Sequence, residues 1–191
     1  MVTDPGVPIA ASTLPLPALS LDGPGLIHDE VRTGLELVRD CGTRLVDITD
    51  TWLPVSDLKQ RDIELLEQAL HEVGLTACGV SIVRRSVIDP VDSAANTEHT
   101  RRAIHLAANL GADVVSVGFH EPLSEEARRV PFWALERPLG HRKDPVPVMR
   151  ELARLAAERS VALALEVYEG GPLGSGRQAV DMVAAIGADN V

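Results

Sequence analysis

Apolar and polar positions alternate along the chain in two rhythms that repeat one after the other. One rhythm places an apolar residue at every third or fourth position, as at Ile63, Leu66, Leu70 and Val73, which is typical of a helix with one buried face. The other is a short run rich in valine, isoleucine and alanine, which is typical of a buried strand. Because helical stretches separate the strand-like runs, the pattern predicts βα units around a parallel sheet.

The predicted elements form five pairs of strand and helix. We expect strands near residues 8–13, 44–49, 76–83, 113–119 and 161–167. We expect helices near residues 28–41, 57–73, 96–110, 146–159 and 176–186. Four helical patterns end at a glycine that suits the left-handed position after a helix: Gly42, Gly74, Gly111 and Gly187. Ser56 or Asp57 is expected to cap the second helix, and Ser175 the last.

The two faces of the expected sheet differ in the size of their side chains. Alternate residues of a strand point to opposite faces, so Leu163 and Leu165 share one face while Ala164 and Glu166 share the other. In the third strand, the residues expected on the bulky face are Cys78, Val80 and Ile82, and those on the small face are Ala77, Gly79 and Ser81. An open doubly wound sheet has helices on both faces and would be bulky on both. The contrast therefore favours a barrel with a narrow interior.

The length of the chain limits how much of a barrel it contains. A complete (βα)8 barrel needs at least about 200 residues, and these 191 residues contain five βα units. The final residues, GADNV, echo the GADVV that opens the fourth strand, so Val191 is expected to begin a sixth strand. The sequence therefore predicts an α/β fold of the (βα)8 TIM-barrel type, in which residues 1–191 form a single incomplete barrel domain truncated before strand 6.

Composition excludes several classes of protein. The net charge of −10 argues against a general nucleic-acid binder, which needs a basic face. Cys41 and Cys78 show no CxxC spacing, so each is expected to be a small core residue and not a zinc ligand or half of a disulfide. The first twenty residues make a poor signal peptide, and no run is long enough to span a membrane. A cytoplasmic location is the default expectation.

Three segments resemble the xylose-isomerase-like TIM-barrel superfamily of sugar phosphate isomerases and epimerases, which also includes endonuclease IV-type enzymes. The segments are LVRDCGTRLVDI, RRAIHLAANLGADVVSVGFH and LARLAAERSVALALEVYEGG, and the resemblance extends over residues 8–191. It implies a divalent metal at the carboxyl-terminal mouth, Mn²⁺ or Mg²⁺ first, with Zn²⁺ or Co²⁺ as alternatives. It also implies that Glu166, at the end of the fifth strand, both ligates the metal and moves a proton. The other ligands would come from strands 6–8, which this chain lacks.

Glu166 and His120 are the candidate metal ligands. A buried carboxylate at the end of the apolar run VALALEVYEG must be paired, neutralised or bound to a metal, and a carboxylate oxygen suits a hard divalent ion. The alternative for Glu166 is a structural ion pair with an arginine. His120 ends the fourth strand on the same face, and the resemblance to endonuclease IV-type relatives implies a metal ligand there. The alternative is a histidine that hydrogen-bonds a sugar hydroxyl or the backbone.

Four residues are candidates for binding a small sugar or sugar phosphate: Asp47, Trp52, Arg84 and Tyr168. Asp47 could reach the mouth, or bond a neighbouring turn. Trp52 could stack on a sugar ring, or pack in the core. Arg84 and its neighbour Arg85 could hold a phosphate or carboxylate, or be a solvated pair. Tyr168 shares the face of Glu166.

Two further expectations concern histidines and a long connection. His99 and His105 lie on a predicted helix and are expected to be solvated. The connection from His120 to Lys143 is long for a βα loop, so it is a candidate lid over the mouth, or a disordered excursion.

The sequence leaves three functions to compare. The first is a metal-dependent sugar or sugar-phosphate isomerase or epimerase that works by proton transfer at Glu166. The second is an endonuclease IV-like phosphodiesterase, which the net acidity and the lack of a second histidine at the end of the third strand oppose. The third is a non-catalytic truncated barrel that binds a partner or self-associates into a homo-oligomer through an open sheet edge. Neither nucleic acid nor membrane is an expected partner.

Overall fold

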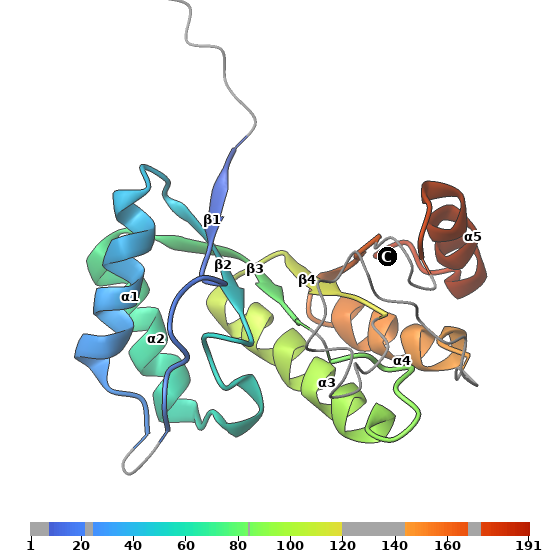
Figure 1. Cartoon of the computed structure of the whole chain (residues 1–191), viewed down its shortest axis with the longest axis horizontal. Coiled ribbons are helices and arrows are strands. Elements are labelled where there is room, and N and C mark those ends of the chain that lie inside the picture. Colours follow the sequence, from blue (N-terminus) through green and yellow to red (C-terminus); the bar gives the residue numbers. More distant parts are fainter. Residues whose placement is uncertain (1–7, 22–24, 84, 120–143, 168–172) are drawn as a thin grey trace, which may run out of the picture.

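Strands and helices alternate along the computed structural model, which describes residues 8–21, 25–83, 85–119, 144–167 and 173–191 (Figure 1). The strands are β1 (Ala10–Ser12), β2 (Leu45–Thr49), β3 (Thr76–Ser81), β4 (Val114–Val117) and β5 (Ala162–Leu165). The helices are α1 (His28–Asp40), α2 (Gln60–Val73), α3 (Ser93–Leu110), α4 (Val146–Ala157) and α5 (Gly176–Ile186), with a 3₁₀ helix η1 (Val55–Asp57) before α2. Every predicted strand and helix is therefore present, with each end within three residues of its expected place.

All five strands are parallel, and they follow one another in the sheet in the order β1-β2-β3-β4-β5. Each strand pairs with its neighbour in the sequence, as Ile48 does with Val80 and Val115 with Leu163. A doubly wound sheet would instead reverse its strand order at a switch point. The unbroken order is that of a βα barrel, which confirms the predicted fold class.

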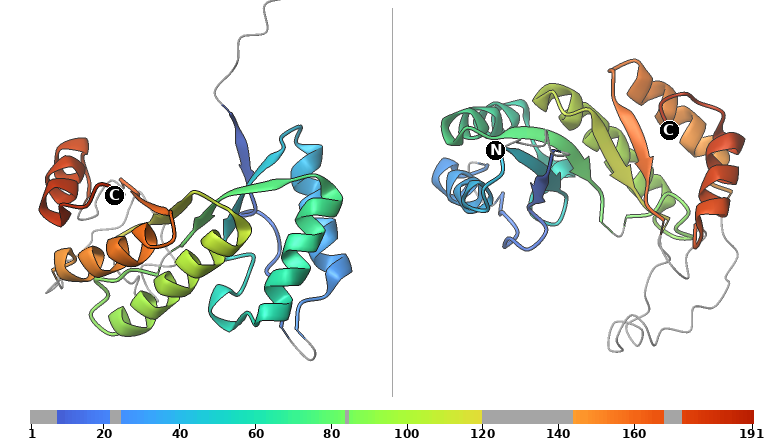
Figure 2. Two further views of the ribbon diagram at one scale, coloured as in Figure 1. Left: turned by 180° about the vertical axis from the view of Figure 1, so that it is seen from behind. Right: turned by 90° about the horizontal axis from the view of Figure 1, so that it is seen from above.

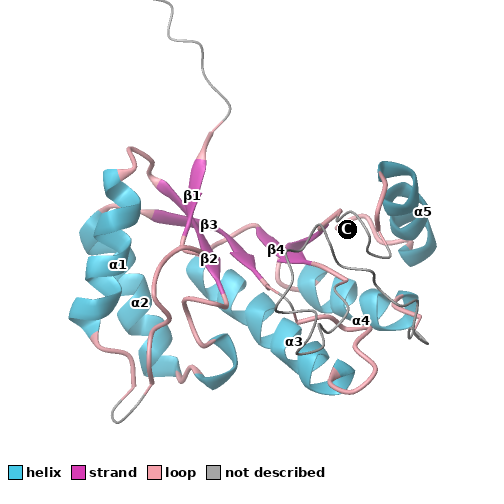
Figure 3. Cartoon of the chain, in the orientation of Figure 1, coloured by secondary structure: helices cyan, strands magenta, loops and turns pink. Residues whose placement is uncertain are grey.

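The helices lie along one face of the curved sheet, and no helix of the described residues covers the other face (Figures 2 and 3). Val46, Val115 and Leu163 point toward the helices and are buried, whereas Ala164 and Glu166 on the opposite face are exposed. The predicted asymmetry between a bulky outer face and a small or polar inner face is therefore confirmed for these strands. Among the described residues, no helix is long and apolar enough to cross a membrane.

A β-bulge in β3 changes which of its residues face the helices. Val46 pairs with Ala77 while Asp47 pairs with Gly79, so Cys78 is one extra residue between two pairs. Residues paired across parallel strands share a face, so Ala77 packs with Val46 toward the helices. The prediction that Ala77 lies on the inner face is therefore wrong. Cys78 is partly exposed and Cys41 is exposed, so the expectation that both cysteines are core residues is also wrong.

The start of α2 depends on a buried carboxylate that the sequence pattern did not reveal. The Oδ2 atom of Asp62 accepts a hydrogen bond from the backbone amide of Lys59 (2.9 Å), and its Oδ1 atom accepts one from the amide of Leu26 (3.0 Å). Asp62 therefore both caps α2 and ties it to the segment before α1. The predicted caps, Ser56 and Asp57, lie in or beside η1 and do not cap α2.

The end of the chain runs alongside β5. The backbone amide of Leu163 donates to the carbonyl of Asn190 (2.8 Å), as one strand does to a parallel neighbour. The Asn190 side chain donates to the carbonyls of Ala153 (2.9 Å) and Val161 (3.1 Å). The last residues of the chain are therefore held against β5 and α4, and the start of a sixth strand near Val191 stays a prediction. At the other end of α5, Ser175 accepts from the amide of Gln178, which confirms the predicted cap.

Gly111 gives a test of the predicted helix ends. Its φ of +67° is left-handed, and a Cβ added there would meet nothing within 4 Å, so the cost of alanine is backbone strain alone. We expect Gly111→Ala to lower the free energy of unfolding by about 1 kcal/mol, measured by urea unfolding. Gly176 also has open space, but it lies in the first turn of α5 without a positive φ. Gly176→Ala should therefore be neutral or slightly stabilising, and an equal loss in both variants would contradict the explanation.

Candidate functional site

Polar side chains lie on the inner face of neighbouring strands. Ser12 on β1 is in register with Asp47 on β2, and Ser81 on β3 is in register with Ser116 on β4. Asp47 in turn pairs with Gly79 of β3, so these positions form adjacent rows across the sheet. The rows approach the carboxyl ends of the strands, which is where active sites of βα barrels are built.

Asp47 bridges three strands of this face. Its Oδ1 atom accepts a hydrogen bond from the Ser81 hydroxyl (2.8 Å), and its Oδ2 atom accepts one from the Ser12 hydroxyl (3.2 Å). The glycine paired with it leaves room for the carboxylate, because a Cβ on Gly79 would lie 3.3 Å from Oδ1. The pairing of Asp47 with Gly79, which has no side chain, lets the Asp47 carboxylate reach hydroxyls on both neighbouring strands.

Burial raises the pKa of Asp47 above that of a free aspartate, because loss of solvent disfavours the charged form. The hydrogen bonds from Ser81 and Ser12 act in the opposite direction and offset this only in part. Burial also raises the pKa of the neighbouring Cys78 thiol, and the negative charge of Asp47 raises it further. A raised pKa favours the neutral thiol of Cys78 over the thiolate.

Glu166 lies just past the end of β5 on the same face. Its backbone amide donates to the carbonyl of Val117 (2.9 Å), which continues the β4–β5 ladder by one more residue. The side chain belongs to the same alternation as Ala164 and is exposed. Glu166 is therefore accessible at the carboxyl end of the strand. The expectation that this carboxylate is buried is wrong.

The described residues contain part of a metal site at most. Among them, no group of three or more His, Cys, Asp or Glu side chains is close enough together to hold a metal ion. Glu166 fits as a single oxygen ligand, since it is an accessible carboxylate at the right edge of the sheet. His120, Arg84 and Tyr168 lie outside the described residues, as does the whole candidate lid from His120 to Lys143, so their roles stay predictions.

Trp52 is a core residue in this structure. Its side chain is 1 % exposed, and it packs so closely on α1 that a Cβ on Gly34 would lie 3.1 Å from the indole ring. Of its two predicted roles, the structure supports packing and gives a sugar ring no exposed indole face to stack on. Gly34 is thus the small residue that lets α1 approach the loop after β2.

Sequence reasoning missed a buried polar cluster behind the carboxyl ends of β2 and β3. His99 was expected to be solvated, but it is 3 % exposed and its Nε2 atom lies 3.0 Å from Oδ2 of Asp50. The prediction failed because Asn96, His99 and Thr100 occupy the buried face of α3. A pattern based on apolar residues does not identify a buried helix face that is made of polar ones. Their three- and four-residue spacing with Ala103 was the available signal.

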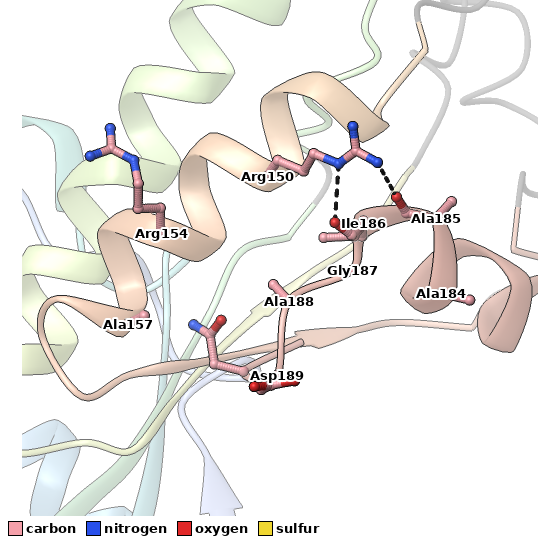
Figure 4. Close-up of a pocket in the computed structure, with 10 residues that line it drawn as sticks. Arg150, Arg154, Ala157, Ala184, Ala185, Ile186, Gly187, Ala188 and Asp189 are labelled. Carbon is pink, nitrogen blue, oxygen red and sulfur yellow. Dashed lines mark hydrogen bonds between the residues drawn. The ribbon is translucent and has the colours of Figure 1, made fainter.

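A groove lies between α4 and the end of α5 (Figure 4). Arg150 of α4 crosses it and donates to the last carbonyls of α5, at Ile186 (3.1 Å) and Ala185 (2.6 Å). Its guanidinium thus caps the carboxyl end of a helix. That end of α5 leads back to the amino ends of the strands, so the groove lies away from the candidate site.

Comparison with known proteins gives one strong likeness and several distant ones. A xylose isomerase-like TIM barrel protein from Mycobacterium smegmatis, solved in complex with magnesium, is 31 % identical with a TM-score of 0.81, over 96 % of this chain and 62 % of its own. A D-allulose 3-epimerase from Methylomonas sp. is 20 % identical with a TM-score of 0.63, over 96 % of this chain and 60 % of its own. An L-ribulose 3-epimerase is 21 % identical with a TM-score of 0.68, over 95 % and 58 %. The two epimerases show likeness of fold alone.

No curated protein sequence matches the chain at a significant level. The chain spans less than two thirds of the length of each of these three solved structures. The sequence profile of the family described as "Xylose isomerase-like TIM barrel" matches residues 35–191. With consecutive parallel strands and one-sided helices, this match shows that the chain belongs to the xylose isomerase-like TIM-barrel family.

Proposed function

We propose that this chain supplies the first five βα units of a divalent-metal-dependent sugar or sugar-phosphate isomerase or epimerase. The observation that carries the proposal is the accessible carboxylate of Glu166 on the inner face at the carboxyl end of β5. Family membership supports it, because structural relatives include sugar epimerases and a family protein solved with magnesium. Mg²⁺ or Mn²⁺ is the proposed ion, with Glu166 as one of its ligands.

Proton transfer is the chemistry that Glu166 suits. An exposed carboxylate can take a proton from the carbon next to a sugar carbonyl and return it to another position or face. A divalent ion, when bound, would polarise that carbonyl and make the proton more acidic. The backbone of Glu166 is held by the hydrogen bond to Val117, so the sheet and not a loop sets where the carboxylate stands.

Asp47 is proposed to accept a hydrogen bond from a sugar hydroxyl deeper in the barrel. An asparagine at this position could keep both serine contacts without the cost of a partly buried charge. Burial makes the charged acid costly, and the hydrogen bonds from Ser81 and Ser12 offset that cost only in part. Polar groups that are held at a cost to stability are typical of functional sites.

The remaining candidates extend the same proposal. His120 would be a second ligand beside Glu166, and Arg84 would bind an anionic group of the substrate. Tyr168 would line the mouth next to Glu166. Phosphodiesterase activity remains a weaker alternative, because no observation in the described residues favours it over proton transfer.

Replacing Glu166 with glutamine tests the proposed acid–base role. We expect Glu166→Gln to lower kcat/KM for epimerisation of a ketohexose such as D-allulose by about 10³-fold, because the amide cannot accept the proton. The assay uses the longest form of the protein that its gene encodes, with Mg²⁺ or Mn²⁺, and follows product and solvent deuterium incorporation. Glu158→Gln, an exposed acid on the far side near the end of α4, is the matched control and should keep wild-type turnover. Retained turnover in Glu166→Gln would refute the assignment.

Asp47→Asn tests whether the acid is held at a cost to stability. The folded-state pKa of Asp47 is raised, so its contribution to stability is present at low pH and is lost as the pH rises through that folded-state value. Relative to wild type, Asp47→Asn should therefore gain unfolding free energy between pH 3 and pH 7, measured by urea unfolding at both. The exposed Asp189→Asn serves as control. A difference between Asp47→Asn and wild type that stays constant with pH, or reverses, would contradict the prediction.

A further inference from the structure

A buried carboxylate behind the mouth joins three separate parts of the fold. Asp50 follows β2 directly, and its side chain is 2 % exposed. Its Oδ1 atom accepts from the backbone amide of Val83 (2.8 Å), just past β3. Its Oδ2 atom lies 3.0 Å from Nε2 of His99 on α3 and 3.6 Å from Nε of Arg85. One acid thus connects the end of β2, the connection after β3, and α3.

The histidine in turn is held from a fourth element. With the proton on Nε2 directed at Asp50, Nδ1 of His99 accepts from the Ser56 hydroxyl of η1. The Arg102 guanidinium of α3 donates to the Ser56 carbonyl (2.9 Å), so η1 and α3 are tied twice. These contacts fix the orientation of the imidazole, and the imidazole fixes the carboxylate.

The same order of groups occurs in nucleophilic Ser–His–Asp triads, but the burial here indicates another role. The histidine of a triad must exchange a proton with the substrate's leaving group. His99 is 3 % exposed, so its ring is out of reach of a substrate. The arrangement is suited to holding neighbouring segments in place.

The connection from β3 to α3 is tied to α3 at a second point. The Asn96 side chain donates to the carbonyl of the buried Ser86 (2.9 Å). Asp89 accepts from the amides of Val91 and Asp92 (both 2.8 Å) and closes the turn that enters α3. Asn96 and His99 are three residues apart on one helix face, so α3 holds this connection at two points, at Ser86 and, through Asp50, at Val83.

We infer that Asp50 and His99 are positioning residues that fix the β3–α3 connection and the Arg85 side chain at the carboxyl edge of the barrel. Arg85 is 52 % exposed, and its Nε faces the buried acid. Removing the imidazole would leave Asp50 with one strong donor fewer while it remains buried, which is costly. The connection would then loosen first, because Val83 and Arg85 depend on that carboxylate. Any consequence for a sugar substrate rests on the proposed function.

Amide hydrogen exchange tests the inference without needing a substrate. In His99→Ala we expect the amides of Val83, of residues 85–89 and of Val91 and Asp92 to exchange about tenfold faster, with the sheet amides of β2 and β4 unchanged. His99→Gln restores a donor near the Nε2 position, so exchange should return to within about threefold of wild type. His105→Ala, an exposed histidine of the same helix, is the matched control and should change nothing in this connection.

Unchanged exchange at Val83 in His99→Ala would overturn the inference, as would a uniform increase across the whole sheet. If His99→Ala does not fold, Asp50→Asn replaces it. That variant keeps an oxygen for the Val83 amide but loses the charge that faces Arg85. Faster exchange over residues 85–92 by about tenfold supports positioning, and exchange within about twofold of wild type overturns it.

Kinetics give a second readout that rests on the proposed function. In the epimerase assay, His99→Ala should raise KM by about tenfold while kcat stays within about threefold, because a displaced connection weakens binding and leaves Glu166 intact. A fall in kcat at constant KM would overturn the positioning role. A wild-type protein with no epimerase activity would refute the proposed function alone, and the exchange experiment would still decide the role of Asp50 and His99.

Discussion

The register between β2 and β3 is the constraint on which the inner face of this barrel depends. Cys78 is an extra residue in that register, and directly after it Asp47 pairs with Gly79. Without the bulge, the side chain paired with Asp47 would be that of Cys78, and the carboxylate could not lie across β3 to reach Ser81. A one-residue shift exchanges the two faces of a strand. The bulge therefore determines both the packing of Ala77 and the position of the acid.

The elements of the fold could be predicted because each is specified locally. The stripe of Leu66, Leu70 and Val73 decides α2, and the left-handed φ of Gly74 ends it. The choice of a barrel over an open sheet followed from the contrast between Leu163 on one face and Ala164 on the other, since a barrel has a narrow interior face. These features depend on spacing and side-chain size, which the sequence displays directly.

The bulge and the buried polar residues could not be predicted in the same way. A bulge depends on hydrogen bonding between two strands, and nothing in TACGVS marks Cys78 as the extra residue. His99 looks solvated because histidine is polar, and its burial becomes favourable only when Asp50 and Ser56 arrive from other elements. The exposure of Glu166 has a different cause, because the residue lies just past the end of β5 on the face away from the helices. Pairing partners that are distant in sequence decided the bulge and the burial of His99.

Two acids three residues apart illustrate how position divides their roles. Asp50 lies behind the sheet and meets a backbone amide, an imidazole and a guanidinium, so its charge is compensated within the protein. Asp47 lies on the inner face, where burial raises its pKa and the hydrogen bonds from two hydroxyls offset that rise only in part. A carboxylate with donors on every side stabilises structure and is closed to a ligand. One with weak donors on an open face retains capacity for a further hydrogen bond, and a sugar hydroxyl is a group that can supply it. Asp50 is thus bonded within the protein at the carboxyl edge, whereas Asp47 lies on the inner face, where the proposed substrate would bind.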